Sequence, residues 1–360
     1  MLKKKSTLLL LAMLAFGWSG HSPLAASDDP WETCISTAHE CPERSGKIKS
    51  LREALKIAEA FGNGDPRLTA TLRLLSVQVP SREAIALLAR EQQILEEQLG
   101  TEFPGLTAGL LAEAELLIAN CQPSEALKLL KKAAKIHPAW GRTNWGVSIS
   151  ILEGSCNWQL GQDEAAIRFY KNALNKGLLR NVFAPDLRNA CHSLAQLCES
   201  KALFADAEEA LKNSLVLCSG NRKPVDSDFL EIEDEILLAD LHVKKGLQAQ
   251  ASKEYKQCFL QLKKLQKKTP CGFGYLLEAR LAERQSKYSE ALDLLAKTGG
   301  VNELQSLDCS ILSATIKMKQ GDKGSAFALC KNGLEAASDC RQDPTGRIVK
   351  LKKLQFNTAG

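Results

Sequence analysis

The sequence lacks an apolar run long enough to cross a bilayer. Its N-terminal apolar stretch covers only residues 8–16, whereas a membrane-spanning helix needs about 20 residues. An excess of one charge is also missing, because 47 Lys and Arg residues stand against 42 Asp and Glu residues, a net charge of +5. Nucleic-acid binding usually requires a strongly basic surface. The composition therefore predicts neither a resident membrane protein nor a nucleic-acid-binding protein.

Motifs of known catalytic chemistry are absent as well. The sequence has no Gly-rich phosphate loop, no His-Glu-x-x-His and no Gly-x-Ser-x-Gly. Cys34, His39 and Cys41 are close in sequence, but no second Cys/His pair follows at zinc-finger spacing. Cys191 and His192 are neighbours, and a helix would point their side chains about 100° apart. We therefore predict no enzymatic activity, no catalytic residues, no cofactor and no metal site.

The N-terminus has the three parts of a secretory signal peptide. Three lysines at positions 3–5 precede the apolar stretch, and the small residues Ala25 and Ala26 follow it. We expect cleavage after Ala26, and so a protein of the periplasm or the extracellular space with no stable membrane insertion. The alternative is an uncleaved signal anchor. Cleavage removes three lysines and no acids, which lowers the net charge from +5 to +2.

Twelve cysteines all lie beyond the expected signal peptide. In an exported protein some cysteines should form disulfides. Cys34 and Cys41 are predicted as a local bridge within an N-terminal segment, residues 27–48. The competing interpretation is that many cysteines are small buried residues at helix contacts. We expect a mixture of the two.

What the sequence does contain is an internal repeat. Eight segments share a small or polar turn, an acidic or polar residue, an alanine and then an amphipathic helix. Successive alanines are 30 to 44 residues apart. These alanines are Ala54, Ala84, Ala126, Ala166, Ala207, Ala251, Ala291 and Ala326. Five glycines are expected at turns: Gly100, Gly161, Gly177, Gly246 and Gly321.

A second regularity supports the same register. The residue twelve positions before each alanine, from Ala126 onward, is small, because two helices can cross closely only where neither side chain is bulky. These residues are Ala114, Gly154, Ala195, Ala239, Ala279 and Ala314. The same step from Ala84 gives Leu72, so the first unit is predicted to be irregular, as terminal repeats often are.

This pattern resembles the tetratricopeptide repeat, a pair of antiparallel helices. The best match is the segment GSCNWQLGQDEAAIRFYKNALNKG, through Gly154, Gly161, Ala166, Tyr170 and Ala173. The spacing near 42 exceeds the family's usual 34 and is similar to the long-repeat, kinesin-light-chain-like variety. The resemblance implies an all-α fold, a right-handed superhelical α-solenoid of tandem helix-turn-helix repeats. We expect about six full repeats and an irregular first unit over residues 49–338, and a capping helix and tail over residues 339–360.

The resemblance also implies a concave groove lined by the first helix of each repeat. The lysine and asparagine clamp with which co-chaperones of this family hold a C-terminal carboxylate is absent. The groove is predicted to be apolar along its middle row and basic toward the C-terminus through Lys244, Arg280, Arg284 and Lys319, so we expect a partner segment with apolar anchors and acidic residues. The predicted protein-binding residues are Glu115, Ser155, His192, Gln196, Asp240, Lys244, Arg280, Arg284 and Lys319.

Two functions remain open at this point. The first is an exported scaffold that binds other proteins or peptide segments through the groove. The second is a thiol/redox-active or disulfide-handling envelope protein, which would require a reactive, low-pKa cysteine. The residues indicate no particular oligomeric state.

Overall fold

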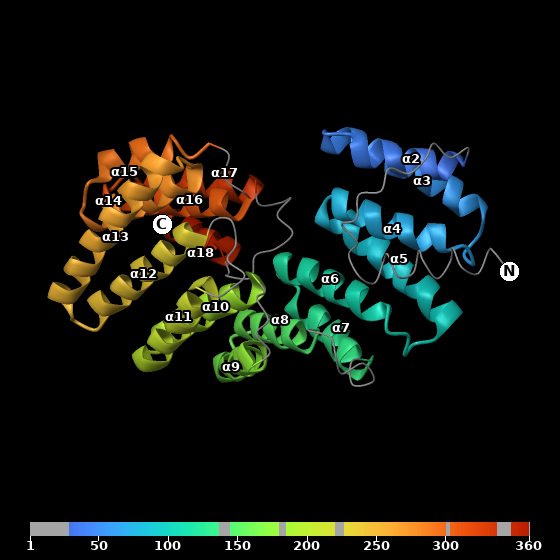
Figure 1. Cartoon of the computed structure of the whole chain (residues 1–360), viewed down its shortest axis with the longest axis horizontal. Coiled ribbons are helices and arrows are strands. Elements are labelled where there is room, and N and C mark those ends of the chain that lie inside the picture. Colours follow the sequence, from blue (N-terminus) through green and yellow to red (C-terminus); the bar gives the residue numbers. More distant parts are fainter. Residues whose placement is uncertain are drawn as a thin grey trace. The chain divides into compact units, whose positions relative to one another are not determined.

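The structure is a computed structural model that describes residues 29–136, 145–179, 185–219, 227–299, 303–336 and 347–359 (Figure 1). The expected signal peptide, residues 1–26, and Cys340 lie outside these ranges. Within them the chain forms seventeen helices and no strand. No helix in the described ranges is both long and apolar enough to cross a membrane.

The helices follow one another with short connections. Their bounds are α2 Pro30–Glu40, α3 Arg44–Ala60, α4 Pro66–Gln78, α5 Ser81–Leu99, α6 Leu106–Ala119, α7 Pro123–Ile136, α8 Trp145–Gln159, α9 Asp163–Leu179, α10 Pro185–Ser200, α11 Phe204–Ser219, α12 Ser227–Lys244, α13 Gln248–Lys268, α14 Gly272–Arg284, α15 Tyr288–Leu295, α16 Glu303–Lys319, α17 Lys323–Ala336 and α18 Arg347–Ala359. The chain divides into two compact units, Met1–Ile149 and Ser150–Gly360.

The helices pack as successive hairpins. In the first unit α2 packs on α3, α4 on α5 and α6 on α7, and in the second unit the same holds for α10 and α11, α12 and α13, α14 and α15, and α16 and α17. Within each unit, successive hairpins pack on one another, as α5 does on α6 and α11 on α12. The predicted all-α solenoid of tandem helix-turn-helix units is confirmed.

The repeated alanines lie at the tight contact of each hairpin. All eight are at most 1% exposed. From Ala84 onward each alanine is the fourth residue of the second helix, and its N–H donates to the carbonyl four residues back. Ala54 differs, because it lies in the middle of α3. The residue at this position is small because a larger side chain would hold the two helices apart.

The small residues twelve positions earlier are buried too. Ala114, Ala239, Ala279 and Ala314 are 0% exposed. At Gly154 an added Cβ would lie 2.8 Å from a ring carbon of Tyr170, closer than real Cβ contacts occur. The glycine in α8 therefore lets the Tyr170 ring of α9 approach its backbone.

The turns inside the six hairpins from α6–α7 to α16–α17 share a geometry that the sequence revealed only in part. Five residues before the alanine the backbone has positive φ, as in the Schellman helix end. The following N–H reaches back to the carbonyl five residues earlier, for example Gln122 N to Leu117 O at 2.8 Å. The positive-φ residues are Cys121, Gly161, Ala202, Gly246, Ser286 and Gly321. Three of the six are not glycine, although the left-handed region favours glycine.

Of the glycines expected at turns, Gly177 is not at one. It lies inside α9, where an added Cβ would be 2.5 Å from a methyl carbon of Leu187 in α10. Its small size permits contact between two successive hairpins instead of a turn. Gly100, in contrast, ends α5 with φ of 87°.

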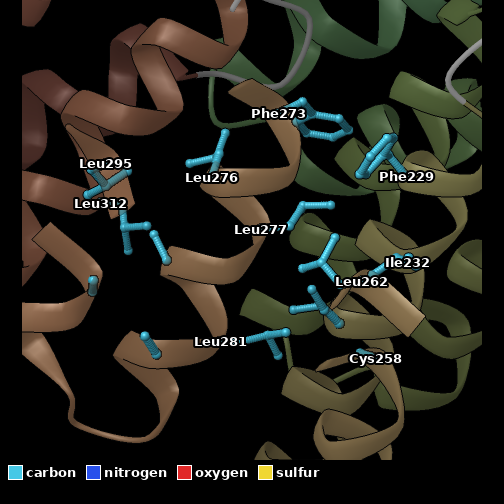
Figure 2. Packing of buried hydrophobic residues seen from close by; sticks show 14 of the residues in the cluster. Phe229, Ile232, Cys258, Leu262, Phe273, Leu276, Leu277, Leu281, Leu295 and Leu312 are labelled. Atoms are coloured by element: carbon cyan, nitrogen blue, oxygen red, sulfur yellow. The ribbon is translucent and has the colours of Figure 1, made fainter. Parts of the chain in front are cut away.

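The core of the second unit continues from hairpin to hairpin. Figure 2 shows side chains of α12, α13, α14, α15 and α16 meeting in one apolar cluster. The Phe229 and Phe273 rings are 6.3 Å apart and tilted by 57°. Leu262, Leu276 and Leu277 are 0% exposed. A core of this kind is built from neighbouring hairpins, as in repeat proteins generally.

The predicted Cys34–Cys41 disulfide is wrong in this structure. Both cysteines are free. Cys34 lies within α2 and Cys41 is its C-cap, so their Cα atoms are separated by about seven helical rises of 1.5 Å. A disulfide requires Cα atoms within about 7 Å. The segment is helical and packs on α3, which holds the two thiols apart.

The last helix covers the end of the array. α18 packs on both α16 and α17. Ile348 is 8% exposed and Leu351 is fully buried against Leu307, Ala314 and Cys330. One turn apart on the same helix, Arg347 and Lys350 lie beside a cavity in the second unit.

Candidate protein-binding groove

A cavity of about 1170 Å³ opens in the second unit. Helices α10, α12, α14, α16 and α18 contribute to its lining, together with α11 and α13. Six of the residues predicted for the groove line it: His192, Gln196, Asp240, Lys244, Arg280 and Arg284. Repeat spacing brings them together, because each hairpin offers the same face of its first helix.

The remaining three predicted residues lie elsewhere. Ser155 is 5% exposed, and its hydroxyl is 3.0 Å from that of Tyr170, so it belongs to the interior of its hairpin. Glu115 lies half-buried on α6 in the first unit. Lys319 forms an ion pair with Glu283 of the preceding hairpin and does not line the cavity.

Part of the cavity lining is apolar. Ile236, Leu237 and Val243 of α12, Phe259 of α13 and Ile311 of α16 contribute to it. Ile236 and Ile311 belong to the predicted apolar middle row. Ligand-binding pockets typically combine a mainly apolar lining with a few polar groups that orient the ligand.

An ionic ladder crosses the first helices at one end of the cavity. We use this name for five residues of alternating charge, one each from α10, α12, α14, α16 and α18: Arg188, Glu233, Arg280, Asp308 and Arg347. Arg188 Nη2 lies 2.9 Å and Arg280 Nη1 2.7 Å from the two carboxylate oxygens of Glu233. Arg280 Nη2 and Arg347 Nη2 lie 3.3 Å and 2.9 Å from Asp308 Oδ2.

Burial makes the ladder electrostatically strong. Burial alone would raise the pKa of the Glu233 carboxyl, but the charges of Arg280 and Arg188 outweigh it and hold the pKa below its usual range. Beside it, Asp234 is fully buried and accepts hydrogen bonds from Arg188 Nη2 at 2.6 Å and Ser214 Oγ at 2.7 Å. Buried charges persist where they are paired and hydrogen-bonded in this way.

A second set of pairs lies further along α12 and α14, about two turns after Glu233 and one turn after Arg280. Arg284 donates to both carboxylate oxygens of Asp240, and the Tyr255 hydroxyl also donates to Asp240 at 2.5 Å. Lys244 pairs with Glu199 of α10. The four basic residues that the sequence predicted in the groove therefore all have acidic partners.

The sequence predicted Asp240 in the groove, but neither the acids Glu199 and Glu233 nor any of these ion pairs. Glu199, Glu233 and Asp240 precede their basic partners Lys244, Arg280 and Arg284 by 44 to 47 residues, which is close to one repeat. Opposite charges one repeat apart on facing helices are a signal that could have been searched for.

The polar cluster around His192 does not have the geometry of a catalytic triad. His192 Nε2 is 2.6 Å from Asp234 Oδ1 and 3.3 Å from Ser214 Oγ, so one nitrogen faces both groups. A triad requires the histidine to use different nitrogens for the nucleophile and the acid. Ser214 is also 0% exposed, which leaves no path for a substrate to its hydroxyl.

The buried thiols are not activated. Burial raises the pKa of Cys198 and Cys218 to about 11 and that of Cys258 to about 12. Nucleophilic cysteines need a lowered pKa and access. Six of the eleven described cysteines are buried, as the interpretation of small residues at helix contacts predicts. No described group of His, Cys, Asp and Glu is arranged to hold a metal ion.

Comparisons by sequence and by structure give different results. No protein-family model matches the sequence, and no curated protein matches it. Solved structures do match: yeast Tom70 is 17% identical, and the match covers 99% of this chain and 72% of Tom70 at a TM-score of 0.52. This match spans the whole array of hairpins.

The chain has the tetratricopeptide-like helical-repeat fold. Two further matches have lower TM-scores. The nearly identical TPR-like repeats of a Podosopora anserina putative kinesin light chain are 18% identical, cover 63% of this chain and all of that chain, and have a TM-score of 0.43. A Rap protein complexed with Competence and Sporulation Factor is 11% identical, covers 94% and 88%, and has a TM-score of 0.49. The tetratricopeptide-like hairpins here include long second helices, such as the 21 residues of α13.

Proposed function

We propose that this chain is a protein-interaction scaffold that binds a segment of another protein in the cavity of its second unit. The observation that carries the proposal is the cavity itself, whose apolar and charged side chains come from successive helices of the array. Such a surface offers contacts along an extended segment, because each hairpin adds one more row of side chains.

The charged part of the lining suits binding better than catalysis. Several of its charged side chains are held in ion pairs between helices, such as Arg284 with Asp240, and these pairs keep this part of the cavity rigid. A preorganised surface loses less conformational entropy on binding. The acidic, basic and apolar positions then set which segments fit.

The test uses steric blocking of the cavity. Gln196 and Ser252 are exposed residues that line it, and Gln257 is an exposed residue of α13 that does not. Peptides of twelve residues are selected from a random displayed library on the purified full chain. Gln196→Trp and Ser252→Trp should weaken the selected peptides at least tenfold, and Gln257→Trp should leave them unchanged. Equal binding to all three variants, with equal thermal melts, would contradict the proposal.

We also propose that the scaffold acts outside the cytoplasm, in the periplasm or the extracellular space. The support is the sequence of residues 1–26, with its basic start, apolar stretch and small-residue end. Intact-mass analysis of protein from the native host should give a chain beginning at Ser27. A chain that retains residues 1–26 and is found in the cytoplasmic fraction would contradict the proposed location outside the cytoplasm.

A further inference from the structure

The cavity lining carries more positive than negative groups. Its basic residues are Lys244, Lys256, Arg280, Arg284, Lys287, Arg347 and Lys350, and its acidic residues are Glu199, Glu233, Asp240 and Asp308. The four acids are each occupied by a basic residue of the same lining. Lys287 forms an ion pair with Glu290 outside the lining, with Nζ 3.7 Å from Oε2. Among the described residues, Lys256 and Lys350 form no ion pair.

Lys350 differs from Lys256 in its surroundings. It comes from α18, where Arg347, one turn earlier, is fixed to Asp308 at 2.9 Å. Residues three apart share a helix face, so the Arg347–Asp308 pair directs this face of α18 to the cavity. Leu351 and Ile348, on the adjacent face of the helix, hold it in place against α16 and α17.

The charges near Lys350 are mainly of its own sign. Lys350 is exposed on α18, but partial desolvation at the cavity and the positive charges of Arg280, Arg284 and Lys244 lower the pKa of its ammonium, and only Asp308 opposes them. The Lys244 pKa is also lowered, by burial and by Arg284. An ammonium surrounded by other cations gains energy from a bound anion, because the anion supplies the missing counter-charge.

We propose that Lys350 anchors a carboxylate of the bound segment, so that the cavity selects acidic protein segments. The inference rests on the proposed function, since it names the chemistry of the ligand in the same cavity. Lys350 suits this role because its flexible stem can bring a compact ammonium to a carboxylate. The repeats supply the apolar side chains, the neutralised pairs and the unpaired Lys256, and the helix after the last repeat adds Lys350 as a second unpaired cation.

Matched variants of α18 isolate the proposed anchor. Lys353 is exposed on the same helix and does not line the cavity, so Lys353→Gln makes the same change of charge outside the site. Lys350→Gln removes the proposed anchor, and Lys350→Arg restores a cation. All three variants of the full chain are checked by thermal melting before use.

The probes are fluorescein-labelled hexaglutamate and hexaglutamine peptides, each with an amidated or a free C-terminus. Fluorescence anisotropy should show that the wild-type chain binds amidated hexaglutamate at least tenfold more tightly than amidated hexaglutamine. Lys350→Gln should abolish this preference, while Lys350→Arg and Lys353→Gln should keep it. A preference for hexaglutamine with a free C-terminus over its amide would assign the carboxylate to the chain end instead of a side chain.

Two results would overturn the inference. One is an equal effect of Lys350→Gln and Lys353→Gln, and the other is equal binding of hexaglutamate and hexaglutamine. The proposed function fails separately, when library-selected peptides bind Gln196→Trp and Ser252→Trp as tightly as the wild-type chain. Cavity-dependent peptides that ignore position 350 would leave the scaffold standing and remove the anchor.

Discussion

Arg284 of α14 donates two hydrogen bonds of 2.6 Å to the two carboxylate oxygens of Asp240 in α12. The two residues are 44 positions apart in sequence and belong to the first helices of consecutive hairpins. A paired geometry of this kind fixes both the distance and the orientation of the two side chains. The neighbouring hairpins are therefore joined by polar contacts at the cavity as well as by the apolar core.

A double-mutant cycle should measure this link. Asp240→Asn, Arg284→Met and the double variant are expected to give a coupling of about 1 kcal/mol in urea unfolding. The control pair is Lys331 with Glu335, which are 3.9 Å apart on α17 and more than 60% exposed, with expected coupling below about 0.5 kcal/mol. Equal coupling in the two cycles would mean that Arg284 and Asp240 behave as an ordinary surface pair.

The ionic ladder should make stability depend on pH. The folded pKa of Glu233 is lowered, so its carboxylate stabilises the fold above the unfolded pKa of about 4.3 and loses this effect as pH falls toward the folded pKa. Glu233→Gln should lower the free energy of unfolding by about 3 kcal/mol at pH 7, because Arg188 and Arg280 lose a charged partner. The difference in free energy of unfolding between Glu233→Gln and wild type should narrow below about pH 4, where the wild-type carboxylate loses its stabilising effect.

Urea unfolding at pH 7 and at pH 3 measures this difference. The control is Glu231→Gln, a change on the same helix at a residue that forms no ion pair within the described ranges. Glu231→Gln should change the free energy of unfolding only slightly at both pH values. A cost for Glu233→Gln that stays constant with pH would show that packing, and not charge, is lost.

The turn residues predict a stabilising substitution. Ala202 has φ of 57° in the turn between α10 and α11. A left-handed conformation costs a residue with a side chain about 1–2 kcal/mol, and glycine loses part of that gain through its greater freedom when unfolded. Ala202→Gly should therefore raise the free energy of unfolding by about 0.5 kcal/mol. Ala205→Gly, three residues later in α11, should lower it, and equal signs for the two would refute the turn assignment.

The thiols should react in two classes. Cys121 is exposed, whereas Cys198, Cys218 and Cys258 are buried with raised pKa values. With Ellman's reagent at pH 8, the reduced chain should show fast reaction that Cys121→Ser diminishes, and the buried thiols should react only after denaturation. Fast reaction at a buried cysteine would instead favour the thiol/redox alternative.

The sequence predicted the hairpin register because that register is set locally. Ala126, Ala166 and Ala207 each open a helix that must pack closely on the one before it, and only a small side chain allows this. The small residue twelve positions earlier reports the other side of the same contact. Both ends of this contact lie within one repeat, so sequence spacing is enough to find it.

The ligand-facing chemistry could be predicted only in part. The rows of the tetratricopeptide resemblance placed six residues at the cavity, including His192 and Arg280. The same rows placed Ser155 at the surface. In the structure the Tyr170 ring packs closely on Gly154, and the Ser155 hydroxyl is hydrogen-bonded to the Tyr170 hydroxyl inside the hairpin. Cys34 and Cys41 were paired by nearness in sequence, and helix α2 separates them.

The sequence by itself determined an array of paired helices and the register of each pair, because the residues that decide these features are neighbours along the chain. Only the tertiary structure decided the charge of the groove. Lys244, Arg280 and Arg284 each meet an acid about one repeat away, as Arg280 meets Glu233, whereas Lys256 and Lys350 form no ion pair within the described residues. Such pairings depend on how far successive hairpins rotate and shift against each other, and that geometry comes from the packing of the whole core.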